Sequence, residues 1–410
     1  MDSKDKAKKA TGSSRLEFEA NTDPLIASAS YPQAEGVARQ SGGFVEDLTQ
    51  FNEPAGIKVI GVGGGGCNAV DSMVEDGLQG VQFIAINTDE QALNRCSADV
   101  RVPIGKETTR GLGSGSNPEV GRQAVEESKE DILRWIEGAD MIFITAGMGG
   151  GTGTGAAPVV ANLAKQSGAL TVAIVTKPFS FEGRYRMMVA EKGIEALRRE
   201  VDAIIVVPND RIFEVIENES RADAFNLSND VLRSGVQGIS EIITACGEQN
   251  VDFADVRTIM ANKGSALLGI GVAGGEHRAE EAARQAISSP LWEGNIHGAT
   301  GVLFNVVAAS NFTMHELQEA ANIIYEAVDP DAIIIFGSVT DEGMEQDVRI
   351  TVVATGFPEH TETEPEVEDG FSFGNSQEEV AFAPQPAVLR NSEEFYEPAI
   401  RRRNRSTGVN

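Results

Sequence analysis

Gly149-Gly150-Gly151-Thr152-Gly153-Thr154-Gly155 is the stretch that decides the fold of this 410-residue chain. An apolar run, Met141–Thr145, precedes it, and a run with helical spacing, 156–167, follows it. Glycines let the backbone turn sharply and approach a ligand closely. The unpaired N–H groups and the positive end of the macrodipole at a helix start attract anions, most often phosphate. The stretch therefore predicts a phosphate loop between a strand and a helix, although a plain glycine-rich connection is an alternative.

A second glycine run, Gly61-Val62-Gly63-Gly64-Gly65-Gly66, ends another apolar segment. It contains G-x-G-x-x-G, and Asp89 follows the next predicted strand, so a nicotinamide-dependent dehydrogenase is one interpretation. Such an enzyme has no reason to carry a second, richer glycine run on a neighbouring strand. Two runs suit a nucleoside triphosphate, whose phosphates they would hold from opposite sides. The G-x-x-x-x-G-K-[ST] pattern of P-loop enzymes is absent from the sequence.

Alternation of apolar and helical segments predicts an α/β fold with a parallel, doubly wound sheet in the first half of the chain. The predicted strands are 57–62, 81–87, 141–145, 170–175 and 203–207, and helices are predicted at 68–78 and from Asn117-Pro118 through Ile136. A long central helix, 222–246, follows. Strands at 267–272, 301–307, 332–337 and 348–354, with helices at 255–261, 278–288 and 314–325, predict a second α/β domain with a mixed sheet.

Composition excludes several classes of function. The chain has 34 Lys and Arg against 62 Asp and Glu, a formal net charge of −28, which argues against nucleic-acid binding and against direct membrane insertion or adsorption. No apolar run approaches the length of a membrane span. Cys67, Cys96 and Cys246 are scattered, as is typical of a reducing compartment. The four histidines lack ligand spacing, so no structural metal site is predicted.

A further motif, Asn250-Val251-Asp252-Phe253-Ala254-Asp255-Val256, occurs after the long helix. Together with the glycine run at 149–155 it resembles the signature of the tubulin and FtsZ superfamily, on the FtsZ branch of bacterial and plastid division GTPases. The resemblance covers about residues 57–356. It implies a GTPase that assembles head-to-tail with itself into filaments of the division ring, in the cytoplasm at mid-cell or in the plastid stroma. GTP or GDP is the implied ligand, with Mg²⁺ bound through the nucleotide. A nucleotide-binding protein that polymerises without turnover is the non-enzymatic alternative.

The resemblance and the composition together divide the chain into six segments. They are a disordered N-terminal extension at 1–52, a GTP-binding domain at 53–221, the central helix at 222–248, a C-terminal activation domain at 249–357, an acidic disordered linker at 358–390 and a partner-binding peptide at 391–410. The last segment ends in apolar and basic residues, so it is interpreted as a hook for membrane-tethering division proteins, or alternatively as an unstructured end.

The resemblance also implies the phosphate-binding residues. The first set holds the α and β phosphates: Gly64, Gly65, Gly66, Cys67 and Asn68. The second set holds the remaining phosphate, with Ala146-Gly147-Met148 closing over its γ end: Gly149, Gly150, Gly151, Thr152, Gly153 and Thr154. The Cys67 side chain is interpreted either as a small packed group or as an activated thiol. Thr109–Gly113 resembles a flexible loop near the phosphates, or is a surface turn.

For the nucleoside, the resemblance implies that Glu182 accepts from the ribose and Arg186 lies near phosphate, a solvated ion pair being the alternative for both. It also implies that Asn209 contacts ribose and guanine and that Phe225 stacks on the base. Asn229 aligns with the base-reading position, but Asp230 is adjacent and a slip of one residue would exchange the two.

The catalytic residues implied by the resemblance are Asp252, Asp255 and Asn250. They lie far along the chain from both glycine runs, so they are not expected to reach their own nucleotide. The resemblance implies that they reach the nucleotide of the next subunit, where the two carboxylates would orient a water and Asn250 would steer the γ-phosphate. A subunit that completes its neighbour's site makes a head-to-tail contact, and such contacts repeat into filaments. Helix capping is the alternative role for the aspartates.

Overall fold

The computed structural model describes residues 55–214, 221–244, 251–289 and 296–357, with backbone alone for 213, 214 and 221–225. The predicted N-terminal extension, acidic linker and partner-binding peptide lie outside the described residues, and so do Asn250 and Cys246. The side chain of Phe225 lies outside them as well. No helix in these described ranges is long and apolar enough to cross a membrane.

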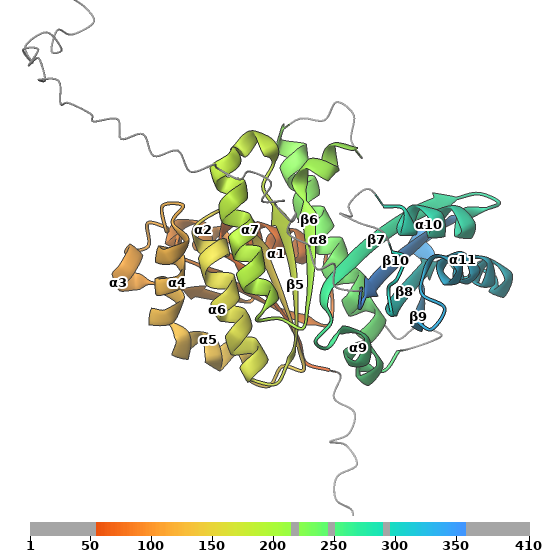
Figure 1. Ribbon diagram of the computed structural model, residues 1–410, viewed down its shortest axis with the longest axis horizontal. Helices are drawn as coiled ribbons and strands as arrows, with labels where there is room; N and C mark the ends of the chain where they lie inside the picture. The colour runs from red at the N-terminus through yellow and green to blue at the C-terminus, as the bar shows by residue number, and fades with distance from the viewer. Residues whose placement is uncertain (1–54, 215–220, 245–250, 290–295, 358–410) are drawn as a thin grey trace, which may run out of the picture. The chain divides into compact units, whose positions relative to one another are not determined.

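One ten-stranded sheet runs through the described residues in the order β3-β2-β1-β4-β5-β6-β7-β10-β8-β9 (Figure 1). Neighbours from β3 to β7 are parallel, β10 is antiparallel to β7 and β8, and β9 is parallel to β8. The predicted α/β fold, parallel first and mixed later, is confirmed. The strands are β1 Ile57–Val62, β2 Val81–Asn87, β3 Val100–Pro103, β4 Met141–Gly147, β5 Leu170–Lys177, β6 Ala203–Pro208, β7 Gly264–Gly274, β8 Gly301–Ala308, β9 Ile333–Thr340 and β10 Asp347–Thr355.

The sheets of the two predicted halves are continuous, because β6 pairs with β7 from Ala203–Gly264 to Ile205–Ala266. Helices cover both faces. One apolar cluster joins the sheet to α1, α8 and α9, and a second joins it to α4, α5, α6 and α7. The helices are α1 Gly63–Glu75, α2 Glu90–Arg95, α3 Lys106–Thr109, α4 Pro118–Glu127, α5 Lys129–Ile136, α6 Thr152–Gln166, α7 Arg184–Arg198, α8 Arg221–Thr244, α9 Phe253–Met260, α10 Arg278–Ile287 and α11 Met314–Ala327, with short 3₁₀ segments η2 Ser180–Glu182, η3 Asn209–Glu214 and η4 Glu342–Met344.

Two predicted helices differ from those in the structure. The helix predicted from Asn117 to Ile136 is two helices, α4 and α5, because Ser128 leaves the helical region (φ −112°, ψ 17°) and its hydroxyl accepts a hydrogen bond from the Gly105 N–H. The helix predicted from Asn68 begins five residues earlier, at Gly63, so the first glycine run forms the opening turn of α1 rather than a loop before it. β3, α2 and α3 are short and were not predicted.

Candidate functional site

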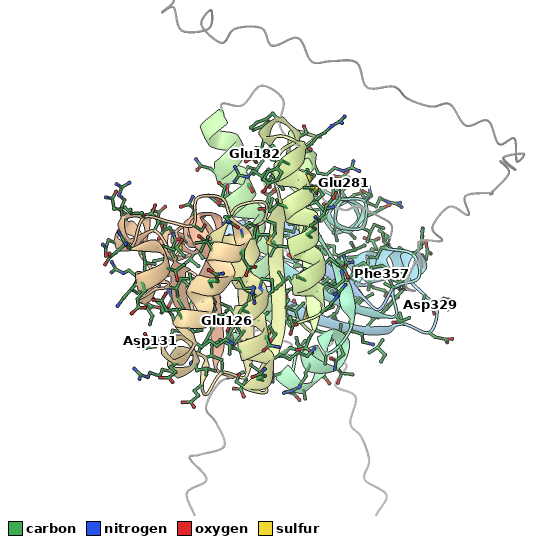
Figure 2. All side chains as sticks on the ribbon, turned by 60° about the vertical axis from the view of Figure 1, so that its left-hand side comes forward. Glu126, Asp131, Glu182, Glu281, Asp329 and Phe357 are labelled. Carbon is green, nitrogen blue, oxygen red and sulfur yellow. The ribbon has the colours of Figure 1, made fainter. Side chains whose placement is uncertain are left out.

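A cavity of about 460 Å³ lies at the carboxyl ends of the parallel strands. Its wall includes Gly64 and Gly65 after β1, Asn87 at the end of β2, Gly147 at the end of β4 and Thr176 near the end of β5. In open parallel sheets this edge is where ligands bind, and the volume suits a small organic molecule. Figure 2 shows Glu182, another residue of the wall, at the upper end of the molecule.

The two glycine runs pack against each other, backbone against backbone. A Cβ on Gly63 would lie 2.8 Å from the Gly153 nitrogen, and one on Gly65 would lie 3.1 Å from the Gly147 nitrogen. Gly63 also has a φ of +73°, a conformation that other residues rarely adopt. Gly63 and Gly65 are therefore required by this close packing. Their contact brings the starts of α1 and α6 to one cavity, where unpaired N–H groups attract anions.

The predicted phosphate residues divide into two groups. Those that line the cavity are Gly64, Gly65, Asn68, Gly150, Gly151, Thr152 and Gly153. The others support the two loops from behind. A Cβ on Gly66 would lie 2.3 Å from the Thr145 carbonyl oxygen, so Gly66 packs on β4. The Thr154 hydroxyl accepts from the Gly149 N–H at 2.8 Å, which fixes the turn before α6.

Cys67 has the same supporting place, on the core side of α1. Its side chain is buried, with its sulfur 3.9 Å from the carbonyl oxygens of Gly61 and Ile86. Hydrogen bonding with Cys96, together with burial, raises the pKa of the Cys67 thiol. A buried thiol with a raised pKa stays protonated and is a poor nucleophile. The structure therefore favours the packed side chain over the activated thiol.

Three hydroxyl groups meet at the start of α6. The Thr152 hydroxyl lies 2.7 Å from that of Thr88 and 2.9 Å from that of Ser114, and all three residues line the cavity. The loop at 109–113 lies next to this cluster, because the N–H of Gly113 donates to the Thr88 carbonyl. Thr88 and Ser114 were not predicted as site residues. Thr88 directly follows the predicted strand 81–87, which is the signal that would have found it.

Four of the predicted nucleoside residues also line the cavity. Arg186 forms an ion pair with Glu182 at 2.7 Å, and both side chains line the cavity wall. The two alternatives predicted for these residues, an ion pair and a place in the site, therefore both hold. The buried Asn209 accepts a hydrogen bond from the Ser228 hydroxyl at 2.8 Å and faces the cavity from η3. Asn229 of α8 also lines the wall.

Asp230, in contrast, is not part of the cavity wall. Its carboxylate accepts from the Ser72 hydroxyl of α1 at 3.4 Å and lies 3.7 Å from the Arg233 side chain. The first of these contacts ties α8 to α1. Of the two adjacent candidates, only Asn229 therefore lines the cavity.

Asp252 and Asp255 do not line the cavity. Both are exposed at the start of α9, and Asp252 makes no capping hydrogen bond with its side chain, so the capping alternative lacks support. Asn250 lies outside the described residues. In Figure 1, α9 lies at the lower end of the molecule, opposite the end that carries Glu182 in Figure 2, and the two views share the vertical axis.

Comparisons with known proteins identify the family. Residues 56–217 match the model of the Tubulin/FtsZ family GTPase domain, and residues 264–358 match that of the FtsZ family C-terminal domain. The empty FtsZ dimer of M. jannaschii is 45% identical, with a TM-score of 0.72 over 75% of this chain and 90% of that chain. This chain belongs to the FtsZ family. A GTPase domain over residues 56–217 excludes the dehydrogenase interpretation.

Two more distant structures share the FtsZ-like fold. The GTPγS-bound protofilament of CetZ2 from Haloferax volcanii is 23% identical, with a TM-score of 0.64 over 74% of this chain and 94% of that chain. The GDP-bound monomer of CetZ1 from the same organism is 22% identical, with a TM-score of 0.65 over 74% of this chain and 95% of that chain. The FtsZ family's GTPase domain implies hydrolysis of GTP and binding of guanine nucleotide by this chain.

Proposed function

We propose that this chain hydrolyses GTP at the junction between two copies, one supplying the cavity and the next supplying Asp252 and Asp255. The observation that carries the proposal is the separation of these groups within one molecule. Arg257 of α9 donates to the Gly168 carbonyl, and the backbone N–H of Asn262, just beyond α9, donates to Asp202. Gly168 and Asp202 precede β5 and β6, so α9 lies at the amino ends of these strands.

The cavity lies at the opposite ends of the same strands. β5 has eight residues, and at ~3.3 Å per residue it spans roughly 26 Å. An aspartate side chain is far too short to cross that length. The carboxylates of α9 therefore cannot reach the cavity of their own molecule. In an end-to-end stack they would reach the cavity of the next copy.

The rim of the cavity is suited to such stacking. Leu112, Phe181 and Tyr185 are next to wall residues on the phosphate and nucleoside sides and are 83%, 62% and 69% exposed. Burial of these large apolar side chains by the facing copy would stabilise an end-to-end stack. In the junction, Asp252 and Asp255 orient and polarise a water for in-line attack on the γ-phosphate, and Asn250 steers that phosphate.

The cavity itself orders the nucleotide. The N-terminal turns of α1 and α6 bind the phosphates through backbone N–H groups, Glu182 accepts from the ribose, and Asn209 and Asn229 hold ribose and guanine. Phe225 stacks on the base. Hard oxygen donors in the wall, including the Asp89 carboxylate and the Thr88 hydroxyl, fit a Mg²⁺ ion held mainly by phosphate oxygens. When bound, Mg²⁺ neutralises charge on the phosphates.

Head-to-tail contacts of this kind build an open filament. FtsZ of M. jannaschii is known as a dimer and CetZ2 as a protofilament, which supports the same assembly here. We further propose that the filaments form the ring at the division site, and that the peptide at 391–410 binds membrane-tethering division proteins. Hydrolysis then removes the γ-phosphate and weakens the junction, so the bound nucleotide controls the stability of the interface between copies.

The test is GTP turnover per molecule as a function of protein concentration. Turnover should rise steeply above a threshold concentration, and the Asp252→Ala variant should bind GTP normally while its turnover falls by about a hundred-fold or more. Glu130→Ala, which removes a carboxylate from α5, is the matched control and should behave as wild type. Equal turnover per molecule in dilute and concentrated samples would overturn the shared site.

A further inference from the structure

The two edges of the sheet are built differently. β3, at one edge, has four residues and ends in Pro103, and its Arg101 is exposed and donates to the Asn94 carbonyl. Short length, proline and an outward charge are the features that protect an edge strand from pairing with another chain. β9, at the other edge, has eight residues, Ile-Ile-Ile-Phe-Gly-Ser-Val-Thr, with neither proline nor charge. The second edge lacks the protection that the first carries.

β9 is nevertheless a firmly held strand. All eight residues pair in register with β8, from Gly301–Ile333 to Ala308–Thr340. The Phe336 ring stacks on the buried Phe304 with centroids 5.6 Å apart, and Ile335 packs against the larger apolar cluster. The open edge is therefore presented in a fixed, extended conformation, which is the state that an incoming strand requires.

The backbone groups of β9 alternate in direction. The N–H of Ile333 donates to the carbonyl of Thr300, just before β8, and the N–H of Asp341 donates to the carbonyl of Ala308, the last residue of β8. The backbone N–H and C=O groups of the odd-numbered residues therefore point toward β8. Even-numbered positions face away, and in the described part of the chain no strand pairs with them. The outward N–H and C=O groups belong to Ile334, Phe336, Ser338 and Thr340.

Carboxylates flank this open edge. Asp331 precedes the strand, and Asp341 and Glu342 follow it, all three exposed, and none forms an ion pair with another described residue. A second copy of β9 paired antiparallel would place Asp331 of one strand near Asp341 and Glu342 of the other at both ends. Like charges placed opposite each other across a strand pair are destabilising, so a second copy is a poor occupant.

We propose that the open edge of β9 is a binding site for a partner protein, which adds one extended strand to the sheet. The segment that fits has apolar and small polar residues in alternation along the strand and Lys or Arg at both ends, complementary to the flanking carboxylates. Main-chain hydrogen bonds to the even-numbered positions supply affinity, and the terminal charges fix the register. This inference is independent of the proposed GTP hydrolysis.

The probe is a synthetic peptide in which Val and Thr alternate between a Lys pair at each end. Hydrogen exchange of the full chain, read amide by amide with and without saturating peptide, tests the geometry. The amides of Ile334, Phe336, Ser338 and Thr340 should slow by at least about ten-fold, while those of the odd-numbered positions, already bonded to β8, stay unchanged. Exchange that does not slow, or that slows at odd and even positions alike, would overturn the proposal.

Two controls make the result specific. Ser338→Pro removes one outward N–H and places a ring on the edge, where proline is tolerated, and should weaken peptide binding by at least about ten-fold relative to Ser338→Ala. The same peptide with N-methyl groups on the amides that face the protein should fail to bind wild type, a result that needs no variant to fold. Equal binding in either comparison contradicts strand addition. Protection that rises with protein concentration in the absence of peptide would mean instead that a second copy occupies the edge.

Discussion

Gly66→Ala should disturb the proposed nucleotide site by shifting the helix start that forms part of the cavity wall. Gly66 does not line the cavity, but a Cβ there would lie 2.3 Å from the Thr145 carbonyl oxygen and 2.9 Å from the Gly61 carbonyl carbon. Both neighbours are backbone atoms of strands and cannot rotate aside, so α1 has to move until the first contact opens beyond 3.0 Å. Overpacking of this kind costs about 3 kcal/mol. The start of α1 moves with it, and GTP binding should weaken by at least about ten-fold.

Gly64→Ala is the matched control, two residues earlier in the same glycine run. No atom lies within 4 Å of the position that the added methyl group would take, and Gly64 lies within α1 without a positive φ. Alanine is favoured over glycine in helices by about 0.5–1 kcal/mol, so this variant should be as stable as wild type or slightly more stable. Urea unfolding followed by circular dichroism is the measurement. With a slope near 3 kcal/mol/M, Gly66→Ala should lower the midpoint by about 1 M. Equal midpoints for the two variants would refute the packing argument.

Three further predictions concern the base, the interface and stability. Asn229→Ala should lower the preference for GTP over ATP in nucleotide titrations, whereas Asp230→Ala, outside the cavity wall, should leave that preference unchanged. Leu112→Asp should keep GTP binding and reduce the light scattering that GTP induces; undiminished scattering would remove this residue from the junction. Burial raises the pKa of Glu316, but hydrogen bonds from the buried Arg278 and from Thr313 together outweigh it and hold the pKa below its usual value. Glu316→Gln should therefore lower the urea midpoint at pH 7, and the difference from wild type should shrink as the pH falls through that lowered pKa, because protonated Glu316 loses the same interaction.

The sequence predicts the elements whose determinants are local. Strand 57–62 and strand 141–145 are mostly apolar runs with a glycine within two residues after each, and their predicted positions agree with the structure to within two residues. Asn117-Pro118 marks the start of α4 because a capping side chain and a proline act within one turn, and the Asn117 side chain does accept from the Glu119 N–H at 3.0 Å. Both glycine runs are recognisable as parts of one site from composition and order alone.

Features set by tertiary contacts could not be predicted in this way. Gly64 and Gly66 are the same residue type in one run, and only the position of β4 separates the one that faces the cavity from the one that supports it. The break at Ser128 depends on a bond to Gly105, a residue far back in the chain. The hydroxyl cluster of Thr88 and Thr152 joins residues 64 positions apart. In each case the residue type is visible in the sequence, and the partner comes from another element.

The charges around the cavity suggest why the proposed junction would depend on Mg²⁺ more than nucleotide binding does. Arg186 is the one cationic residue in the described wall, and it is already paired with Glu182, while Asp89 adds a further carboxylate. Helix N-termini carry only about half a charge each, so they hold phosphates without neutralising them. The proposed junction brings Asp252 and Asp255 of the next copy toward this same negative centre. The assembled state therefore concentrates more negative charge than the nucleotide-bound monomer, and neutralisation by a divalent cation favours assembly over binding alone.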